Sequence, residues 1–282
     1  MIRFPPRKIL VAFDQSSASV TAWRHAESLA RQLGASVEVL YVEPWAVGVG
    51  SYPLPTPIPS QVRLIRRKIR AVVGEQVKVL VVEGDAAQRI LSVARGRQAD
   101  LIVMGTHGRS GLERALLGSV AEAVMRASSI PVLAARGPAK KIRSILAPLY
   151  FNSNSNAGFV YAAHAAAALG AHLTALYVNV DPVWGGNPLM RLTSQIESLP
   201  AKLHVRCEAV VETEEDAAPA IIKAARRHDV IALVEHGKSA IMDALFGTTA
   251  EKVLRGSKKS ILVVPAPRVA VHARPRGKTA AA

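Results

Sequence analysis

The chain has 282 residues, of which 50% are hydrophobic, 20% are charged and only 5% are aromatic. This composition excludes an intrinsically disordered chain, a collagen-like repeat and a disulfide scaffold. The length favours two domains over one. The single cysteine, Cys207, can form neither an internal disulfide nor a zinc–thiolate cluster. The apolar run before Asp14 is too short for the core of a secretory signal, so a reducing, cytoplasmic location is expected.

Basic residues outnumber acidic ones by 36 to 21, which gives a net charge of +15. Residues 1–139 carry 18 basic and 10 acidic groups, residues 140–267 carry 14 and 11, and residues 268–282 carry four basic groups and no acidic one. Such a surface favours anionic partners, namely nucleotides, nucleic acid or acidic lipid head groups, without choosing among them.

The sequence repeats itself. Residues 33–42 recur as residues 169–178, at an offset of 136, and residues 100–104 recur as residues 229–233, at an offset of 129. Two constant offsets separated by a deletion of seven residues indicate a degenerate duplication. We therefore expect two related domains, over residues 1–139 and 140–267, followed by a basic tail over residues 268–282.

Short apolar runs, typical of buried strands, alternate with segments of helical spacing in the first repeat. Loops rich in proline or glycine are expected over Glu43–Pro59 and Gly105–Gly118. The expected strands and helices are, in chain order, a strand over Lys8–Phe13, a helix over Ser19–Leu33, a strand over Val37–Val42, a helix over Gln61–Gly74, a strand over Lys78–Val82, a helix over Ala87–Arg95, a strand over Leu101–Met104, a helix over Ser119–Ala127 and a strand over Val132–Ala135.

The second repeat follows the same plan with a shorter middle. We therefore predict an α/β fold of two tandem Rossmann-like domains, of the adenine-nucleotide alpha-hydrolase-like type. Each would be a mostly five-stranded parallel sheet with helices on both faces. The apolar stretch Phe159–Val178 is too rich in alanine and polar interruptions for a membrane span, and the repeat accounts for it better.

The strongest chemical signal is the loop that follows the strand Leu101–Met104. It reads Gly105-Thr106-His107-Gly108, then nine residues, then Gly118-Ser119 at the start of a helix. Glycines allow backbone turns with positive φ and let amides approach a phosphate without a Cβ in the way. The helix that begins at Ser119 adds free amides and its dipole. In an open α/β sheet, ligands bind where the strand order reverses, so this loop predicts a nucleotide site.

A resemblance to a known family rests on this loop, on the first-strand segment Ile9–Ser16 and on the closing segment Ser129–Leu133. In these features the sequence resembles the universal stress protein family in its tandem form over residues 5–266. The family's ATP-binding branch carries this glycine pattern. The resemblance implies ATP, with the adenosine end near Asp14 and Val42. It implies that the ribose and phosphates lie along Met104, Gly105, Gly108, Gly118, Ser119 and Val120, with Arg109 beside them. A divalent cation such as Mg²⁺ or Mn²⁺ would bridge the phosphates, but no acidic pair locates it.

The second repeat departs from this pattern. Tyr150 stands at the position of Asp14, Val234 at that of Gly105, and Glu235 at that of Thr106. A branched side chain and a carboxylate then occupy the phosphate path, and like charges in a confined site repel. We expect one ATP per chain. The second repeat would serve as a pseudo-symmetric partner that pairs with the first as two such domains pair in a homodimer.

The implied role is regulatory or protective in the stress response, with ATP held intact, since neither a P-loop nor a catalytic constellation stands out. One alternative is a slow ATPase or nucleotide hydrolase that uses the same loop. Another is an interaction module whose basic helix and tail contact RNA or lipid, although a solvated helix face is the simpler interpretation. Homodimerisation and an unknown protein partner remain open. Valine at Gly105 or Gly118 is expected to block ATP and to leave the fold intact.

Four further features have plain structural interpretations. Asp14 could organise the turn into the first helix rather than bind a ligand. Cys207 is expected to pack rather than react, and His107 to face solvent. The acidic run from Glu212 to Asp216 reads as the start of a helix, where the helix dipole favours carboxylates, rather than as a metal site.

Overall fold

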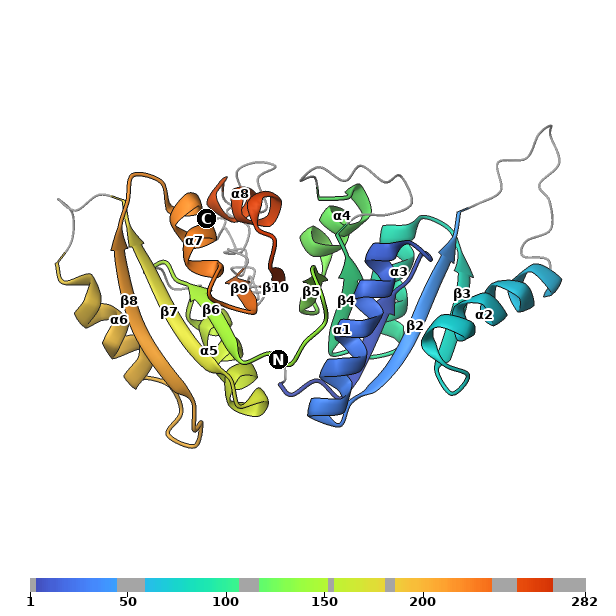
Figure 1. Cartoon of the computed structure of the whole chain (residues 1–282), viewed down its shortest axis with the longest axis horizontal. Helices are drawn as coiled ribbons and strands as arrows, with labels where there is room; N and C mark the ends of the chain where they lie inside the picture. The colour runs from blue at the N-terminus through green and yellow to red at the C-terminus, as the bar shows by residue number, and fades with distance from the viewer. Residues whose placement is uncertain are drawn as a thin grey trace, which may run out of the picture.

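The computed structural model describes residues 4–44, 59–106, 117–151, 155–180, 186–234 and 248–265. Figure 1 shows that strands and helices alternate through this part of the chain. In chain order the elements are β1 (Lys8–Ala12), α1 (Ser17–Leu33), β2 (Ser36–Glu43), α2 (Pro59–Val73), β3 (Lys78–Glu83), α3 (Ala86–Gly96), β4 (Leu101–Gly105), α4 (Ser119–Ala127), β5 (Val132–Ala135), β6 (Ser144–Pro148), α5 (Ser155–Leu169), β7 (His172–Asn179), α6 (Pro188–Glu197), β8 (Arg206–Thr213), α7 (Ala217–Ala225), β9 (Val230–Val234), α8 (Thr248–Gly256) and β10 (Ser260–Val264).

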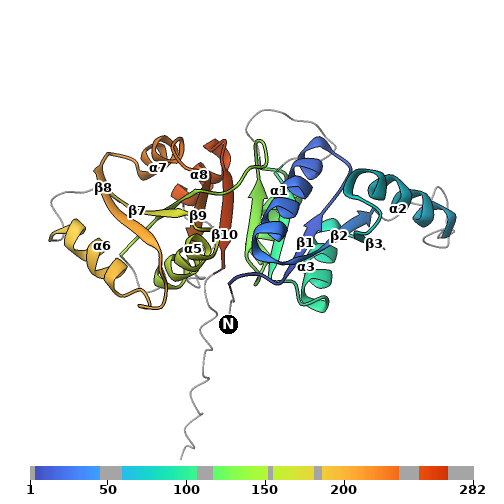
Figure 2. The same ribbon diagram turned by 60° about the horizontal axis from the view of Figure 1, so that its bottom comes forward.

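The strands form one ten-stranded sheet in the order β3-β2-β1-β4-β5-β10-β9-β6-β7-β8. Neighbouring strands are parallel within each half. The two halves meet where β5 and β10 pair antiparallel, with Leu133 opposite Leu262 (Figures 1 and 2). The predicted fold class is confirmed, and the two five-stranded sheets are continuous with each other.

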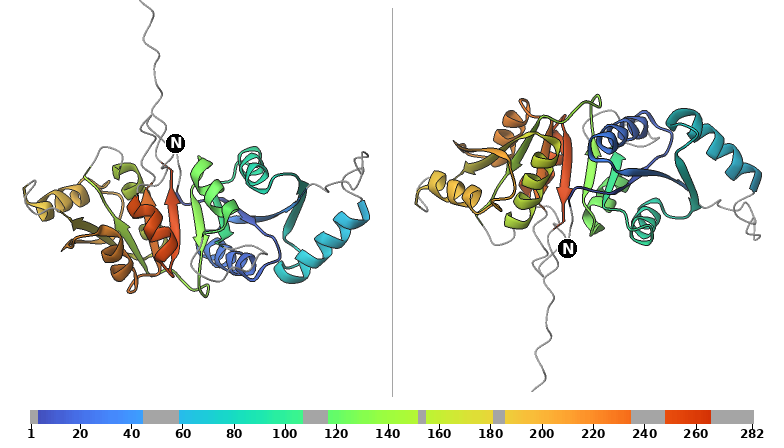
Figure 3. Two further views of the ribbon diagram at one scale, coloured as in Figure 1. Left: turned by 90° about the horizontal axis from the view of Figure 1, so that it is seen from above. Right: turned by 90° about the horizontal axis from the view of Figure 1, so that it is seen from below.

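Helices cover both faces of the sheet, as Figure 3 shows from two opposite sides. Successive strand residues point to opposite faces, so Ile9 and Val11 enter one core while Leu10 enters the other. Helices α1, α2, α5 and α6 contribute to the first core, and α3, α4, α7 and α8 to the second. Burial on both faces explains why the strands read as continuous apolar runs rather than as alternating patterns.

Two equivalent aspartates show the duplication in atomic detail. Asp100 Oδ2 accepts the backbone amides at the start of β1, from Arg7 at 2.9 Å and from Lys8 at 3.0 Å. Asp229 lies 129 residues further along and accepts the two amides at the start of β6, at 2.8 and 3.2 Å. The repeat therefore preserves a hydrogen-bonding device that fixes how the first strand of each half begins.

The halves are also joined by side chains. Arg136 is the residue that follows β5. Its guanidinium donates hydrogen bonds to two backbone carbonyls at the end of α8, that of Leu254 at 2.5 Å and that of Ser257. Burial lowers the pKa of Arg136 to about 10, so the group is still cationic at neutral pH, and a cation is favourable at a helix C-terminus. On α8, Arg255 lies 3.4 Å from Glu122 of α4, and α4 and α8 are neighbours in Figure 1.

Several element boundaries were predicted closely, and local chemistry explains the earlier start of α1. The structure has α4 and β5 over the expected residues. Helix α1 begins at Ser17 rather than at Ser19, because Ser16 is the N-cap and its hydroxyl accepts the amide of Ser19 at 3.2 Å. The apolar stretch over residues 159–178 is divided between α5 and β7.

A buried histidine predicts a pH dependence of stability. His25 of α1 is 7% exposed, its Nε2 lies 3.2 Å from the carbonyl of Gly137, and burial lowers its pKa. The unfolded chain therefore binds this proton more readily than the folded chain, so the free energy of unfolding falls as the pH drops below the ordinary histidine pKa of about 6.5.

Urea denaturation at about pH 7.5 and pH 5 measures this loss. His25→Gln keeps a donor for the Gly137 carbonyl but does not titrate, so the variant should lose less stability than the wild type over the same interval. Equal losses in the two proteins would show that His25 does not contribute.

Candidate functional site

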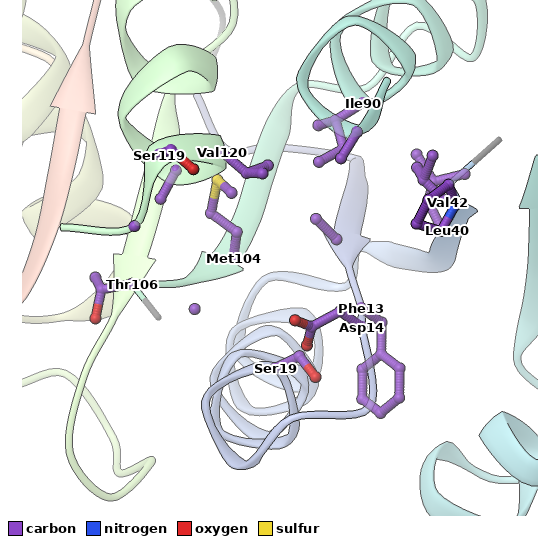
Figure 4. A pocket seen from close by; sticks show the side chains of 16 residues that line it. Phe13, Asp14, Ser19, Leu40, Val42, Ile90, Met104, Thr106, Ser119 and Val120 are labelled. Carbon is purple, nitrogen blue, oxygen red and sulfur yellow. The ribbon is translucent and has the colours of Figure 1, made fainter. Parts of the chain in front are cut away.

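A cavity of about 370 Å³ opens at the carboxyl ends of β1, β2 and β4 (Figure 4). The chain runs from β1 to β2 and β3 on one side and then returns to β4 on the other, so the strand order reverses next to β1. Reversal points of this kind leave a crevice between the loops that follow the strands. The described lining residues are Ala12, Phe13, Asp14, Ser19, Leu40, Val42, Pro44, Ala86, Ile90, Met104, Gly105, Thr106, Gly118, Ser119, Val120 and Ala121.

Asp14 lies two residues beyond β1 and both organises a turn and lines the cavity. Its Oδ1 accepts the amide of Ser16 at 3.0 Å and the hydroxyl of Ser16 at 2.5 Å. Between them, Gln15 has a φ of 69°, a left-handed conformation that this turn stabilises. Figure 4 shows Asp14 and Ser19 on the α1 side of the cavity, and Ser119 and Val120 on the α4 side.

The wall between these two sides is apolar. Leu40 and Val42 come from β2, Ile90 from α3, and Met104 from β4 (Figure 4). Leu40, Ile90 and Met104 are at most 4% exposed, while Val42 is half-buried. The cavity therefore offers a hydrophobic surface between its two polar ends.

The N-terminus of α4 forms one of those polar ends. Gly118 is the N-cap and provides no side chain, and the first hydrogen bond of the helix runs from the amide of Glu122 to the carbonyl of Gly118 at 2.9 Å. Within the described part of the chain, the amides of Ser119, Val120 and Ala121 have no acceptor. Three unpaired amides at the positive end of a helix dipole make a site for an anion.

Two expectations about the loop glycines are wrong. Neither Gly105 nor Gly118 has a positive φ, and Gly118 lies at −64°. The Gly118 amide donates to the carbonyl of Thr106 at 2.7 Å, so the donors available to a ligand begin at Ser119.

Gly105 is needed for a different reason. A Cβ at this position would lie 2.7 Å from the carbonyl carbon of Ala18 and 2.8 Å from its oxygen, because the first turn of α1 crosses directly over the end of β4. A valine at Gly105 therefore could not leave the fold intact, which corrects the expectation made from the sequence.

The structure brings most of the predicted site residues together. Asp14, Val42, Met104, Gly105, Gly118, Ser119 and Val120 all line the one cavity. Gly108, Arg109 and His107 belong to residues 107–116, which lie outside the described residues. The sequence did not single out Leu40 or Ile90, because both follow the ordinary apolar periodicity of a core strand and a core helix.

The corresponding region of the second half has different chemistry. Tyr150 takes the place of Asp14 and is 38% exposed. Val234 ends β9 as Gly105 ends β4, and Thr248 begins α8 as Ser119 begins α4. Glu235 and Gly247 lie outside the described residues. The carboxylate next to the first strand and the glycine that ends the fourth are thus both replaced.

Two other predicted features have structural roles. Asp216 is the N-cap of α7, accepting the amide of Ala218 at 3.0 Å, and its carboxylate lies 2.7 Å from Lys252 Nζ. Burial raises the pKa of the Cys207 thiol to about 11, as expected for a packing residue.

Over the described residues, no group of three His, Cys, Asp or Glu side chains is arranged to hold a metal ion. No helix in the same part of the chain is long and apolar enough to cross a membrane.

Comparison with known proteins identifies the family of this chain. The model of the universal stress protein family matches residues 6–136 and, a second time, residues 141–265. The chain belongs to the universal stress protein family. A universal stress protein of Methanocaldococcus jannaschii is 36% identical over 145 residues, which cover 48% of this chain and 85% of that protein. One from Mycolicibacterium smegmatis is 26% identical over an alignment that covers 91% of this chain and 96% of that protein.

Solved structures show the same architecture over nearly the whole chain. A universal stress protein from Archaeoglobus fulgidus aligns with a TM-score of 0.69 at 20% identity, covering 92% of this chain and 96% of that one. One from Pseudomonas aeruginosa aligns with a TM-score of 0.66 at 17% identity, covering 93% and 94%. At these identities the likeness shows the fold alone, so the ligand has to be argued from the cavity.

Proposed function

We propose that this universal stress protein binds one molecule of ATP in its first domain, residues 1–139, and acts as a regulatory or protective protein in the cytoplasm. The second domain, residues 140–267, serves as its pseudo-symmetric partner. The observation that carries the proposal is one cavity in which three helix amides with no acceptor among the described residues, a carboxylate and an apolar wall face a common space.

The parts of the cavity fit the parts of ATP. The amides of Ser119, Val120 and Ala121 supply donors for phosphate oxygens, and the Ser119 hydroxyl adds another. The apolar wall beside Val42 accepts the face of an adenine ring, and Asp14 accepts hydrogen bonds from hydroxyl or amino groups of the adenosine. A divalent cation would screen the phosphate charges when bound with the nucleotide.

Binding of one ATP per chain is the direct test. Isothermal titration calorimetry with MgATP should return a stoichiometry of one, because only the first half combines Asp14 with glycine at the end of the fourth strand. A second, equivalent site per chain would contradict the argument that Tyr150 and Val234 disable the second half. No heat of binding and no nucleotide retained after native purification would refute the proposal as a whole.

A further inference from the structure

Helix α2 carries a concentration of positive charge that the cavity does not use. Its 15 residues, Pro59–Val73, include four arginines and one lysine and no acidic residue. The arginines are Arg63, Arg66, Arg67 and Arg70, at positions i, i+3, i+4 and i+7. Residues with this spacing lie along one face of a helix, so the four form a continuous arginine stripe.

The arginine stripe lacks an ion-pair partner in the part of the chain that the structure describes. Among the described residues, no ion pair includes any of its four members. Residues 44–74 contain no Asp or Glu at all. Arg70 Nε is buried and has no hydrogen-bond partner in the described part. Like charges at i and i+4 destabilise an isolated helix, so the stripe is unfavourable for the folded chain by itself.

The duplication provides an internal comparison. Helix α6 connects β7 to β8 as α2 connects β2 to β3, and it packs through the fully buried Leu192 as α2 packs through Ile69. Helix α6 contains one arginine and one glutamate. The architecture therefore does not require a basic helix at this place, and the charge of α2 needs another explanation.

The geometry of α2 favours a phosphate backbone over a lipid surface. Its main apolar side is committed, since Ile69 and Val73 are buried in the core. Two apolar residues of α2 are exposed, Leu64 and Val72, but they lie eight residues apart with Lys68 between them and form no continuous apolar face to insert into a bilayer. Seven residues of helix span about 10 Å, which is the distance covered by about three phosphates along one nucleic acid strand. Guanidinium groups match phosphate oxygens in pairs.

We infer that the arginine stripe of α2 is a docking site for the phosphodiester backbone of nucleic acid. The helix lies next to β3, the terminal strand of the sheet, at the outer end of the molecule (Figure 1). Arg63, Arg66 and Arg67 are exposed there. The helix contains no aromatic residue for base stacking, so binding is insensitive to sequence. None of the four arginines is among the described residues that line the proposed ATP cavity.

Binding of a fluorescein-labelled poly(U) oligonucleotide, measured by anisotropy between about 50 and 200 mM salt, tests the inference. The variant Arg63→Gln/Arg66→Gln/Arg67→Gln removes three exposed charges from the stripe. The control Arg24→Gln/Arg31→Gln/Arg95→Gln removes three exposed charges from α1 and α3, so both variants have the same net charge and the same basic tail.

The stripe variant should lose roughly 30-fold or more in affinity at about 50 mM salt, and the slope of log K against log salt should become shallower by about 2. The control should stay within about threefold of the wild type. The midpoint of thermal unfolding, measured for the stripe variant and the wild type, reports whether the stripe variant is folded. Equal losses in both variants, or none in either, would overturn the inference. So would binding to phosphatidylglycerol vesicles, lost only in the stripe variant, without binding to poly(U).

Discussion

Val120→Glu is expected to lower the affinity for ATP by at least about 100-fold, a loss of about 2.7 kcal/mol, while leaving the fold unchanged. Val120 is 37% exposed and is the second residue of α4, where it lines the cavity beside the unpaired amides. A carboxylate there lies next to the place proposed for the phosphates and repels them. It does not harm the helix, because an acidic side chain in the first turn of a helix is favourable.

The chain supplies a matched control in Thr249→Glu. Thr249 is the second residue of α8 and lies 129 residues after Val120, so the substitution adds the same charge at the equivalent place in the second half. MgATP binding by calorimetry and unfolding in urea should be measured for both variants. We expect normal ATP affinity for Thr249→Glu. A reduced affinity in both, or in neither, would mean that the phosphates do not lie at α4.

The elements could be predicted because the sequence encodes them locally. The strand over residues 101–104 is a run of apolar residues buried on both faces, and the helix over residues 119–127 has a glycine N-cap and a regular apolar stripe. The repeat then transferred the whole plan to the second half. Asp14 and Ser119 could be expected beside one cavity, since each belongs to a connection that follows the carboxyl end of a parallel strand.

The join between the halves could not be predicted in the same way. Val132–Ala135 and Ser260–Val264 are plain apolar runs, and nothing in either says that they pair with each other across an antiparallel edge. The role of Arg136 depends on that pairing, because only then do the last carbonyls of α8 lie within reach of its guanidinium. Contacts between residues more than a hundred positions apart leave no periodic signal in the sequence.

The loop glycines show a further limit of prediction from the sequence. The spacing predicted a phosphate loop, but it did not distinguish a glycine that approaches a ligand from a glycine that approaches another helix. In the structure Gly105 packs under the first turn of α1, and the amide of Gly118 is occupied by the carbonyl of Thr106. The spacing pointed to the end of the sheet where the cavity lies, but the reason behind it holds only in part, since the free donors of the described residues belong to Ser119 and the two residues after it.

Gly105→Ala tests this packing and should reduce the free energy of unfolding by about 1–3 kcal/mol, the usual cost of overpacking a tight contact. The added methyl group would lie 2.7 Å from the carbonyl carbon of Ala18, and a helix backbone cannot rotate away as a side chain can. The first turn of α1 must therefore shift. Asp14 and Ser16 immediately precede that turn, so ATP affinity should fall together with stability.

Gly96→Ala is the control for the effect of glycine itself. Gly96 is the last residue of α3, it does not have a positive φ, and a Cβ there would meet no atom within 4 Å. Alanine at this position should change the free energy of unfolding by less than about 1 kcal/mol, in the stabilising direction, because it restricts the unfolded chain. Urea denaturation compares the two variants. If Gly105→Ala were as stable as Gly96→Ala but failed to bind ATP, Gly105 would act on the ligand rather than on α1.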